Sequence, residues 1–249
     1  MHSFSMKSLT TEQFAAAIAD TKPVVILLPV GSVEPHGPHL GLLTDTIISE
    51  ACAEHAANRL SHDHNVYIAP SVPYGVTDYA SGFKGAISIA EDALVNYLIA
   101  IVKGFIDNGV DHVCLINNHL EPDHYQAILK TLDAFQSTQC SVACPLKRRW
   151  ARTLSDEFKR GECHAGQYET AIIMAADADG VHTDIQHTLP EVPVSLSDNI
   201  MKGVNTFTDM GMSQAYAGAP AKATIAEGQE LIAKLSHMIV TEITEAMSA

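Results

Sequence analysis

The sequence predicts an α/β fold in which helices cover both faces of a mainly parallel sheet. Short apolar runs rich in β-branched residues have the composition of buried strands, and the longer segments between them repeat apolar residues at helical spacing. Strands that alternate with helices in this way form parallel sheets, because the crossover helices pack on the sheet faces. A chain of 249 residues can bury one sizeable core, and we expect a single domain over residues 1–249.

Four segments are predicted to be the strands of this sheet. They are short and apolar, which is typical of strands that are buried on both faces. In chain order they cover residues 24–30, 65–70, 112–117 and 141–144.

Five longer segments are predicted to be helices. Gly109 stands where a C-terminal cap is expected, and Pro122 suits the first turn of a helix. Residues 184–220 contain Pro, Gly, Ser and Asn throughout and have no clear period, so we expect a long irregular excursion within the domain. The predicted helices cover residues 44–60, 91–109, 122–136, 164–177 and 227–245.

Composition and charge exclude several classes of function. Fifteen Lys and Arg residues against 29 Asp and Glu give a net charge of −14, which repels nucleic acid and anionic lipid, so neither is expected as a partner. No apolar run reaches the roughly 18 residues that span a bilayer, and the start lacks a secretory signal. We therefore expect a cytoplasmic protein. Its five cysteines, an odd number, are expected to be reduced thiols.

Glu34 and His36 follow the first predicted strand directly. In an extended loop, residues two apart point the same way, so both side chains can face one site while Pro35 stiffens the turn. Asp45 lies a little further along, at the start of the next predicted helix. It is a third candidate ligand, although Thr44 or Asp45 is also a natural N-cap for that helix.

A similar pair, His119 and Glu121, follows the strand over residues 112–117. The carboxyl ends of parallel strands meet at one edge of a sheet, which is where ligands collect in open α/β folds. Imidazoles combined with carboxylates suit Zn²⁺, Mn²⁺ or Fe²⁺, and this many ligands could hold two such ions around a bridging carboxylate. We interpret the two pairs as a metal centre rather than as a surface coincidence.

His164 and Glu169 are further candidates, near the start of the helix predicted over residues 164–177. His164 could take a proton from a metal-activated water and return it to a leaving nitrogen. The alternative is a histidine that bonds to backbone near the helix start. Glu169 is equally compatible with a direct metal ligand, with an acceptor behind the ligands and with a plain acid of the first turn.

The segments "LLPVGSVEPHGPHLGLLTDT", "VPYGVTDYASGFKGAISI", "LINNHLEPDH" and "CHAGQYETAIIMA" resemble the creatininase (creatinine amidohydrolase) family. The resemblance implies a three-layer α-β-α sandwich, a binuclear centre of zinc with zinc or manganese, hydrolysis of a C–N bond and a homohexamer. It also implies a role for each candidate. Glu34 and His119 would hold one ion, His36 and Glu121 the other, Asp45 would bridge them, and His164 would be the catalytic histidine. We expect Glu121 to have a catalytic role in addition.

The substrate expected from this resemblance is a small molecule with an amide bond, such as a lactam or a formamide. Creatinine itself is not expected, because Trp150 is the only tryptophan and Leu120 stands where creatininases carry a tyrosine. Asp78, Tyr79 and Leu120 are expected to help bind substrate. Arg149 or Arg160 could pair with a substrate carboxylate, or simply lie on a solvated helix face. Relatives that cleave a peptide or a cyclic ketone, and a catalytically silent metal-binding protein, remain alternatives.

Overall fold

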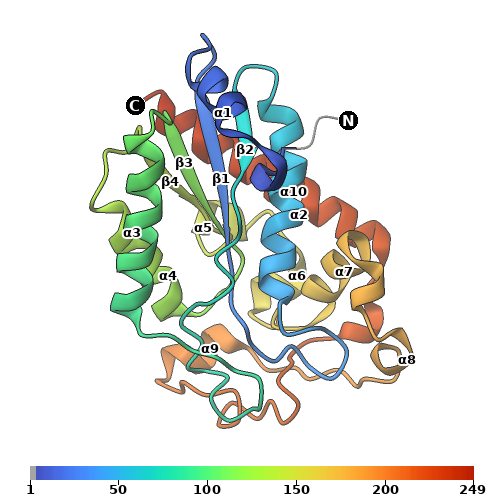
Figure 1. Ribbon diagram of the computed structural model, residues 1–249. Helices are drawn as coiled ribbons and strands as arrows, with labels where there is room; N and C mark the ends of the chain where they lie inside the picture. Colours follow the sequence, from blue (N-terminus) through green and yellow to red (C-terminus); the bar gives the residue numbers. More distant parts are fainter. Residues whose placement is uncertain (1–3) are drawn as a thin grey trace.

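The computed structural model describes residues 4–249, and its centre is a four-stranded sheet in which all strands are parallel (Figure 1). The strand order is β2-β1-β3-β4, so the first and third strands are neighbours in the middle of the sheet. The predicted strand positions are confirmed to within two residues at each end. The strands are β1 (Val24–Val30), β2 (Asn65–Ile68), β3 (His112–Asn117) and β4 (Cys140–Ala143).

Helices cover both faces of the sheet and make it the middle of three layers, as predicted (Figure 1). One face packs against α2 (Thr44–Leu60), α7 (Gln167–Ala176) and α10 (Ile225–Met247), and the other against α1 (Thr11–Ile18), α3 (Glu91–Asp107) and α4 (Pro122–Leu132).

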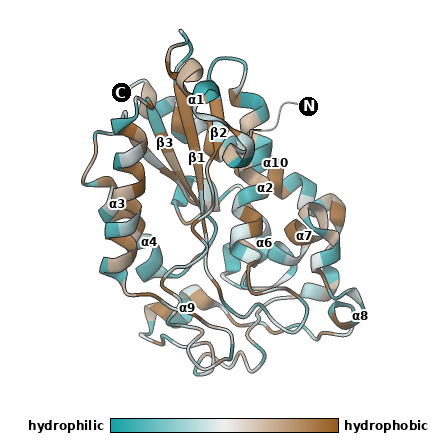
Figure 2. Cartoon of the chain, viewed as in Figure 1, coloured by the Kyte–Doolittle hydropathy of each residue, from teal (hydrophilic) through white to brown (hydrophobic). Residues whose placement is uncertain are grey.

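Alternate residues of β1 show how this layering follows from strand geometry. Val25 and Leu27 belong to the apolar core beneath α2 and α10, whereas Ile26 and Leu28 belong to the core beneath α3. Successive side chains of a strand point to opposite faces, so both faces must be apolar, and the strands are coloured as hydrophobic in Figure 2. This explains why the first strand is an unbroken apolar run in the sequence.

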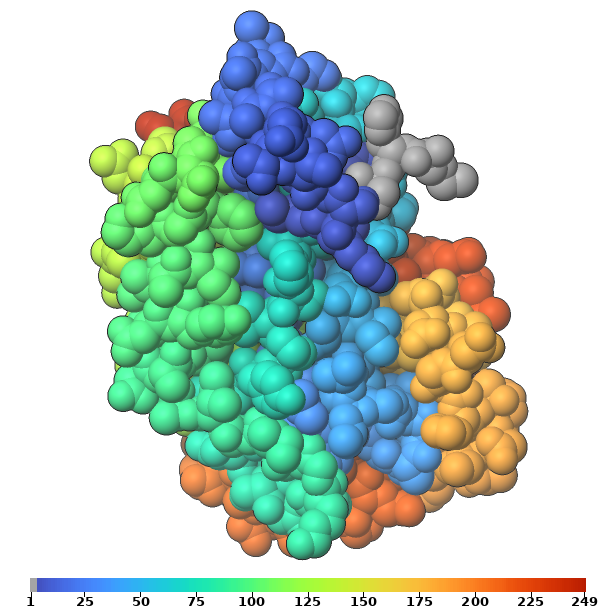
Figure 3. Space-filling model, viewed as in Figure 1, coloured from blue at the N-terminus to red at the C-terminus, as the bar shows by residue number. Residues whose placement is uncertain are grey.

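An irregular layer formed largely by residues 184–220 covers the carboxyl ends of the strands, at the lower end of the molecule in Figure 1. A third, smaller apolar cluster joins this layer to the loop that follows β2, through Ala80, Phe207 and Met212 among others. Figure 3 shows these two parts of the chain, coloured teal-green and orange, side by side at the lower end of the molecule. The irregular segment of residues 184–220 therefore covers the edge of the sheet where the candidate residues lie. It forms the roof of the site.

One predicted helix differs from the observed one in a way that affects the site. The helix expected from residue 164 begins at Gln167, so His164 precedes it in a loop. The helix over residues 44–60 has its predicted bounds. Five helices were not predicted: α1 and four short ones, α5 (Arg148–Ala151), α6 (Asp156–Arg160), α8 (Thr183–Gln186) and α9 (Leu196–Met201). Over residues 4–249, no helix has the length and apolar character needed to cross a membrane.

The contact between α10 and α7 gives a test of the packing. A Cβ at Gly228 would fall on the carbonyl oxygen of Ala171, so we expect Gly228→Ala to destabilise the protein by about 1–3 kcal/mol, although alanine favours helix. Gly104 in α3 is the matched control, because its Cβ would meet no atom within 4 Å. Gly104→Ala should stabilise by about 0.4–1 kcal/mol. Urea denaturation measures both changes, and equal effects would contradict the packing.

Candidate metal centre

The loops that follow β1 and β3 bring four candidate side chains to one edge of the sheet. Val30 at the end of β1 pairs with Asn117 at the end of β3, so the two loops start side by side. The loop after β1 carries Glu34 and His36, and the loop after β3 carries His119 and Glu121. All four side chains are buried.

Asp45, in the first turn of α2, lies between two of the histidines. Its Oδ1 is 3.2 Å from Nε2 of His36, and its Oδ2 is 3.0 Å from Nδ1 of His119. The hydroxyl of Ser32 donates a hydrogen bond of 2.7 Å to Oδ2. The N-cap role considered for Asp45 is wrong, because Leu43 is the N-cap residue and no side chain caps this helix. Its carboxylate instead faces the site.

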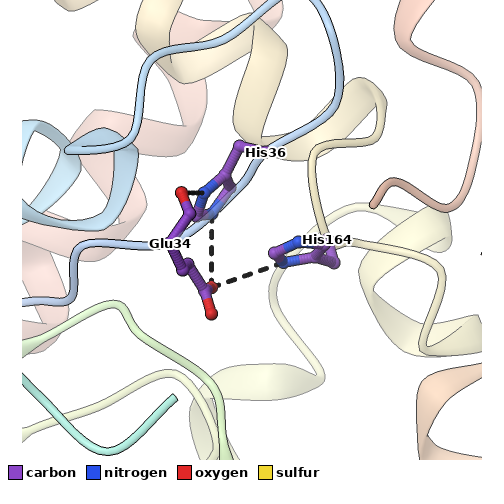
Figure 4. A group of neighbouring side chains, drawn as sticks. All are labelled: Glu34, His36 and His164. Carbon is purple, nitrogen blue, oxygen red and sulfur yellow. Dashed lines mark hydrogen bonds and ion pairs between the residues drawn. The ribbon is translucent and has the colours of Figure 1, made fainter. Parts of the chain in front are cut away.

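Three overlapping groups of side chains could each hold a metal ion, within the part of the chain that the structure describes. In each group one ligand atom per residue lies within 4.8 Å of the others, and every residue is buried. Asp45 belongs to two groups and Glu34 to two, so neighbouring ions would share a carboxylate. The groups are Glu34, Asp45 and His119; His36, Asp45 and Glu169; and Glu34, His36 and His164, the last drawn in Figure 4.

The distances favour Glu169 rather than Glu121 as the partner of His36. Oε2 of Glu169 is 3.5 Å from Nε2 of His36 and also accepts a hydrogen bond from the Ala165 N–H. Glu121 is in none of the three groups. Its carboxylate accepts hydrogen bonds from the backbone N–H groups of residues 78 and 79, at 2.9 and 3.2 Å. At this one position the arrangement of side chains favours a different residue from the one that the resemblance implies.

Each histidine of the site has one ring nitrogen within hydrogen-bonding distance of a backbone carbonyl. A carbonyl can only accept, so that nitrogen carries the proton and the other is free to bind a cation or take up a proton. The free nitrogens face the carboxylates. The bonds join His36 Nδ1 to the Glu34 carbonyl (3.1 Å), His119 Nε2 to the Val76 carbonyl (2.7 Å) and His164 Nε2 to the Pro35 carbonyl (3.0 Å).

The electrostatics of the cluster suit divalent cations. Burial opposes a charge on His36, but the negative charges of Asp45, Glu169 and Glu34 outweigh burial and raise its pKa to about 10. Nε2 of His36 is buried and has no hydrogen-bond partner in the described structure. Imidazole nitrogens and carboxylate oxygens are the ligands that Zn²⁺ and Mn²⁺ accept. The residues present thus fit a metal centre.

His164 lies at the edge of this cluster and has different surroundings. Its ring centroid is 4.4 Å from that of His36 and 4.3 Å from that of Phe207. Its free Nδ1 points toward Oε1 of Glu34, 3.7 Å away (Figure 4). Burial, together with the charge of His36, lowers its pKa to about 4. The imidazole is therefore neutral at pH 7, with a lone pair on Nδ1.

An apolar pocket opens beside the cluster. Apart from His36, the residues of the metal-binding groups form part of its lining, together with Glu121. Tyr79 and Leu120 line it, as expected for substrate-binding residues, whereas the Asp78 side chain lines a neighbouring hollow instead. Further apolar lining comes from Leu196, Ile200 and Phe207 in the roof. These three were not predicted, because the irregular sequence of residues 184–220 gives no local signal for them.

The two arginines considered for substrate binding have other partners. Arg149 bonds to Glu242 and Glu245 of α10, and Arg160 bonds to Glu162. Among the described residues that line the pocket there is no lysine or arginine. A substrate carboxylate would find no side-chain cation there.

Several supporting residues were also missed by the sequence reasoning. Thr77 donates a hydrogen bond to Oε2 of Glu34. His124, which sequence reasoning did not connect with the site, is fully buried and packs edge-on against the ring of His119, with centroids 4.6 Å apart. His39 is also buried and bonds to Thr170. A hydroxyl residue near a ligand loop is too common a feature to identify such roles in advance.

Comparison with known proteins identifies a family and a fold. The family model Creatininase (creatinine amidohydrolase) matches residues 7–243. A mycofactocin precursor peptide peptidase of Mycolicibacterium smegmatis is 28% identical over 85% of this chain and 81% of its own. A 3-dehydro-scyllo-inosose hydrolase of Thermotoga maritima is 26% identical over 90% and 79%. The solved structure "Creatininase Mn" has the same fold, with a TM-score of 0.77 at 19% identity over both whole chains.

Proposed function

The chain belongs to the creatininase family, and from this premise we propose that it hydrolyses a C–N amide bond in a small, uncharged molecule with the help of two divalent cations. The observation that carries the proposal is Asp45, whose two oxygens face His36 and His119 in two overlapping metal-binding groups. Zinc and manganese suit this nitrogen and oxygen donor set, and iron is a further option.

We assign the residues as follows. Glu34, Asp45 and His119 would hold one ion, and His36, Asp45 and Glu169 would hold the other. Bound ions of this kind polarise a carbonyl oxygen and lower the pKa of water. His164, held by the Pro35 carbonyl through Nε2, takes a proton at Nδ1 and returns it to the leaving nitrogen. Glu121, held by two backbone N–H groups, faces the same pocket as a second proton acceptor.

The pocket supports an uncharged substrate with an apolar face, such as a lactam or a formamide. Four carboxylates, on Glu34, Asp45, Glu121 and Glu169, offset the charge of two dications. The wall opposite them is apolar. A charged group on the substrate would lose its hydration there without gaining a partner, which is costly.

A peptidase or a hydrolase of a cyclic ketone is the second candidate, because the curated relatives described above carry those names. The roof argues against a long peptide, since Phe207 is only 4% exposed and covers His164. The apolar wall likewise suits a polyhydroxylated ring poorly. The homohexamer, the cytoplasmic location and the single domain remain predictions.

A substrate panel tests the proposal. We expect metal-loaded protein to hydrolyse neutral lactams, imides or formamides. The same molecules bearing a carboxylate should react with a kcat/KM at least about tenfold lower, equivalent to about 1.4 kcal/mol. Cyclic ketones and short peptides complete the panel, and chelator-treated protein is the control. Turnover of peptides or ketones alone, with both ions bound, would favour the second candidate.

A further inference from the structure

Glu157, in the short helix α6, is a buried acid whose carboxylate accepts three backbone hydrogen bonds. Its Oε1 accepts from the N–H groups of Gln167 (3.0 Å) and Ala219 (2.7 Å), and its Oε2 accepts from that of Tyr168 (2.7 Å). The residue is 4% exposed. Burying a carboxylate is costly unless its oxygens are well bonded. The burial of Glu157 therefore needs a physical explanation.

The three N–H groups belong to segments that carry the site. Gln167 and Tyr168 form the start of α7, and the next residue is Glu169, which faces His36. Ala219 lies two residues after Ala217, whose N–H donates a 2.9 Å hydrogen bond to the His164 carbonyl. Glu157 thus connects α6 to the two segments that position Glu169 and His164.

The start of α7 depends on Glu157 for its capping. The first N–H groups of a helix have no partner within the helix, and Gly166, the N-cap residue here, supplies no side-chain acceptor. Glu157 supplies the acceptor from a different helix. A carboxylate at this position is also favoured by the helix dipole.

Two glycines leave space for the Glu157 carboxylate, and the backbone nearby is strained at Ala165. A Cβ at Gly166 or Gly218 would collide with Oε1 of Glu157, and Gly218 has a φ of +76°. Ala165 has a φ of 49°, which is unfavourable for a residue other than glycine. Such strain persists only where the surrounding contacts maintain it. Ala165 directly follows His164 and donates its N–H to Glu169.

We propose that Glu157 is a positioning residue that sets the place of Glu169, and thereby controls the metal site formed by His36, Asp45 and Glu169. The other site, formed by Glu34, Asp45 and His119, is held by the loops after β1 and β3 and the start of α2, which Glu157 does not bond to. The inference rests on the proposed binuclear function. It predicts that a substitution of Glu157, which does not itself line the pocket, weakens the binding of one ion and leaves the binding of the other nearly unchanged.

Calorimetric titration of the metal-free, full-length protein with Mn²⁺ tests this inference. Wild type should show two binding events, and Glu169→Gln should identify the event that belongs to its site. Glu157→Gln replaces one accepting oxygen by a donating amide group and so loses at least one of the three bonds. We expect it to weaken the Glu169-dependent event by roughly 10- to 100-fold and to leave the other event nearly unchanged.

Two variants serve as controls for general damage. Glu162 is a neighbouring buried acid that bonds to the side chain of Arg160, and Glu162→Gln should change neither event. Glu242→Gln removes the charge and one of the two oxygens that accept bonds from Lys147, Arg149 and the Trp150 indole, far along α10. It should lower the melting temperature without separating the two metal affinities.

The outcomes are distinct. Equal weakening of both events by Glu157→Gln, or no weakening, would overturn the positioning role. If this variant does not fold, Glu157→Asp provides the test, because it keeps the charge but is too short to make all three bonds, and it should again weaken the Glu169-dependent event selectively. A single binding event in wild type would instead count against the proposed binuclear function itself.

Discussion

Replacement of Asp45 by asparagine is expected to remove most of the bound metal and to abolish activity. Its oxygens lie 3.2 Å from Nε2 of His36 and 3.0 Å from Nδ1 of His119, and Asp45 is the residue shared by the two sites proposed here. The variant loses a negative charge from both sites at once. We expect turnover to fall at least about 10³-fold, because metal activation of a carbonyl and of water is worth several kcal/mol.

Elemental analysis and steady-state kinetics on the same preparation measure this effect. Asp123→Asn is the matched control, since Asp123 is an exposed acid at the start of α4 and belongs to none of the metal-binding groups. Ser32→Ala, which removes the 2.7 Å hydrogen bond to Asp45, should cause a smaller loss of roughly tenfold in metal affinity. Full metal content and activity in Asp45→Asn would rule out the bridging role.

Replacement of His164 by alanine is expected to lower turnover by roughly 10² to 10⁴, the usual contribution of a positioned general acid or base. Both ions should remain bound. Nδ1 of His164 is 3.7 Å from Glu34, whereas Nδ1 of His119 is 3.3 Å from the same oxygen. His164 is thus the more loosely associated histidine, and Phe207 covers its other face.

Metal content and kcat must again be measured together. His112→Gln is the control, because His112 is equally buried but lies at the opposite end of β3, bonded to Thr138 and Ser141. It should reduce stability and leave kcat close to that of wild type. A loss of one ion from His164→Ala would identify His164 as a ligand through the group that it forms with Glu34 and His36.

The elements that sequence reasoning placed correctly are those with strong local patterns. β1 is a run of seven buried residues, and α2 extends from Thr44 to Leu60, as its apolar repeat predicted. The short helices α5, α6, α8 and α9 have four to six residues each. That is less than two turns, too short for a 3.6-residue period to appear. The eight-residue α1 was missed as well, although Thr10 and Gln13 form a capping box there.

Three features could be predicted from the sequence alone: the α/β class, the positions of the strands and the presence of ligand-type side chains after β1 and β3. These follow from local periodicity and from the rule that parallel strands end at one edge. Three contacts became visible only in the folded chain. Glu169 lies 3.5 Å from His36, Glu121 bonds to backbone N–H groups, and Phe207 covers His164. The physical reason is that these contacts join residues distant in the chain, so their distances depend on how whole layers pack and no local pattern encodes them.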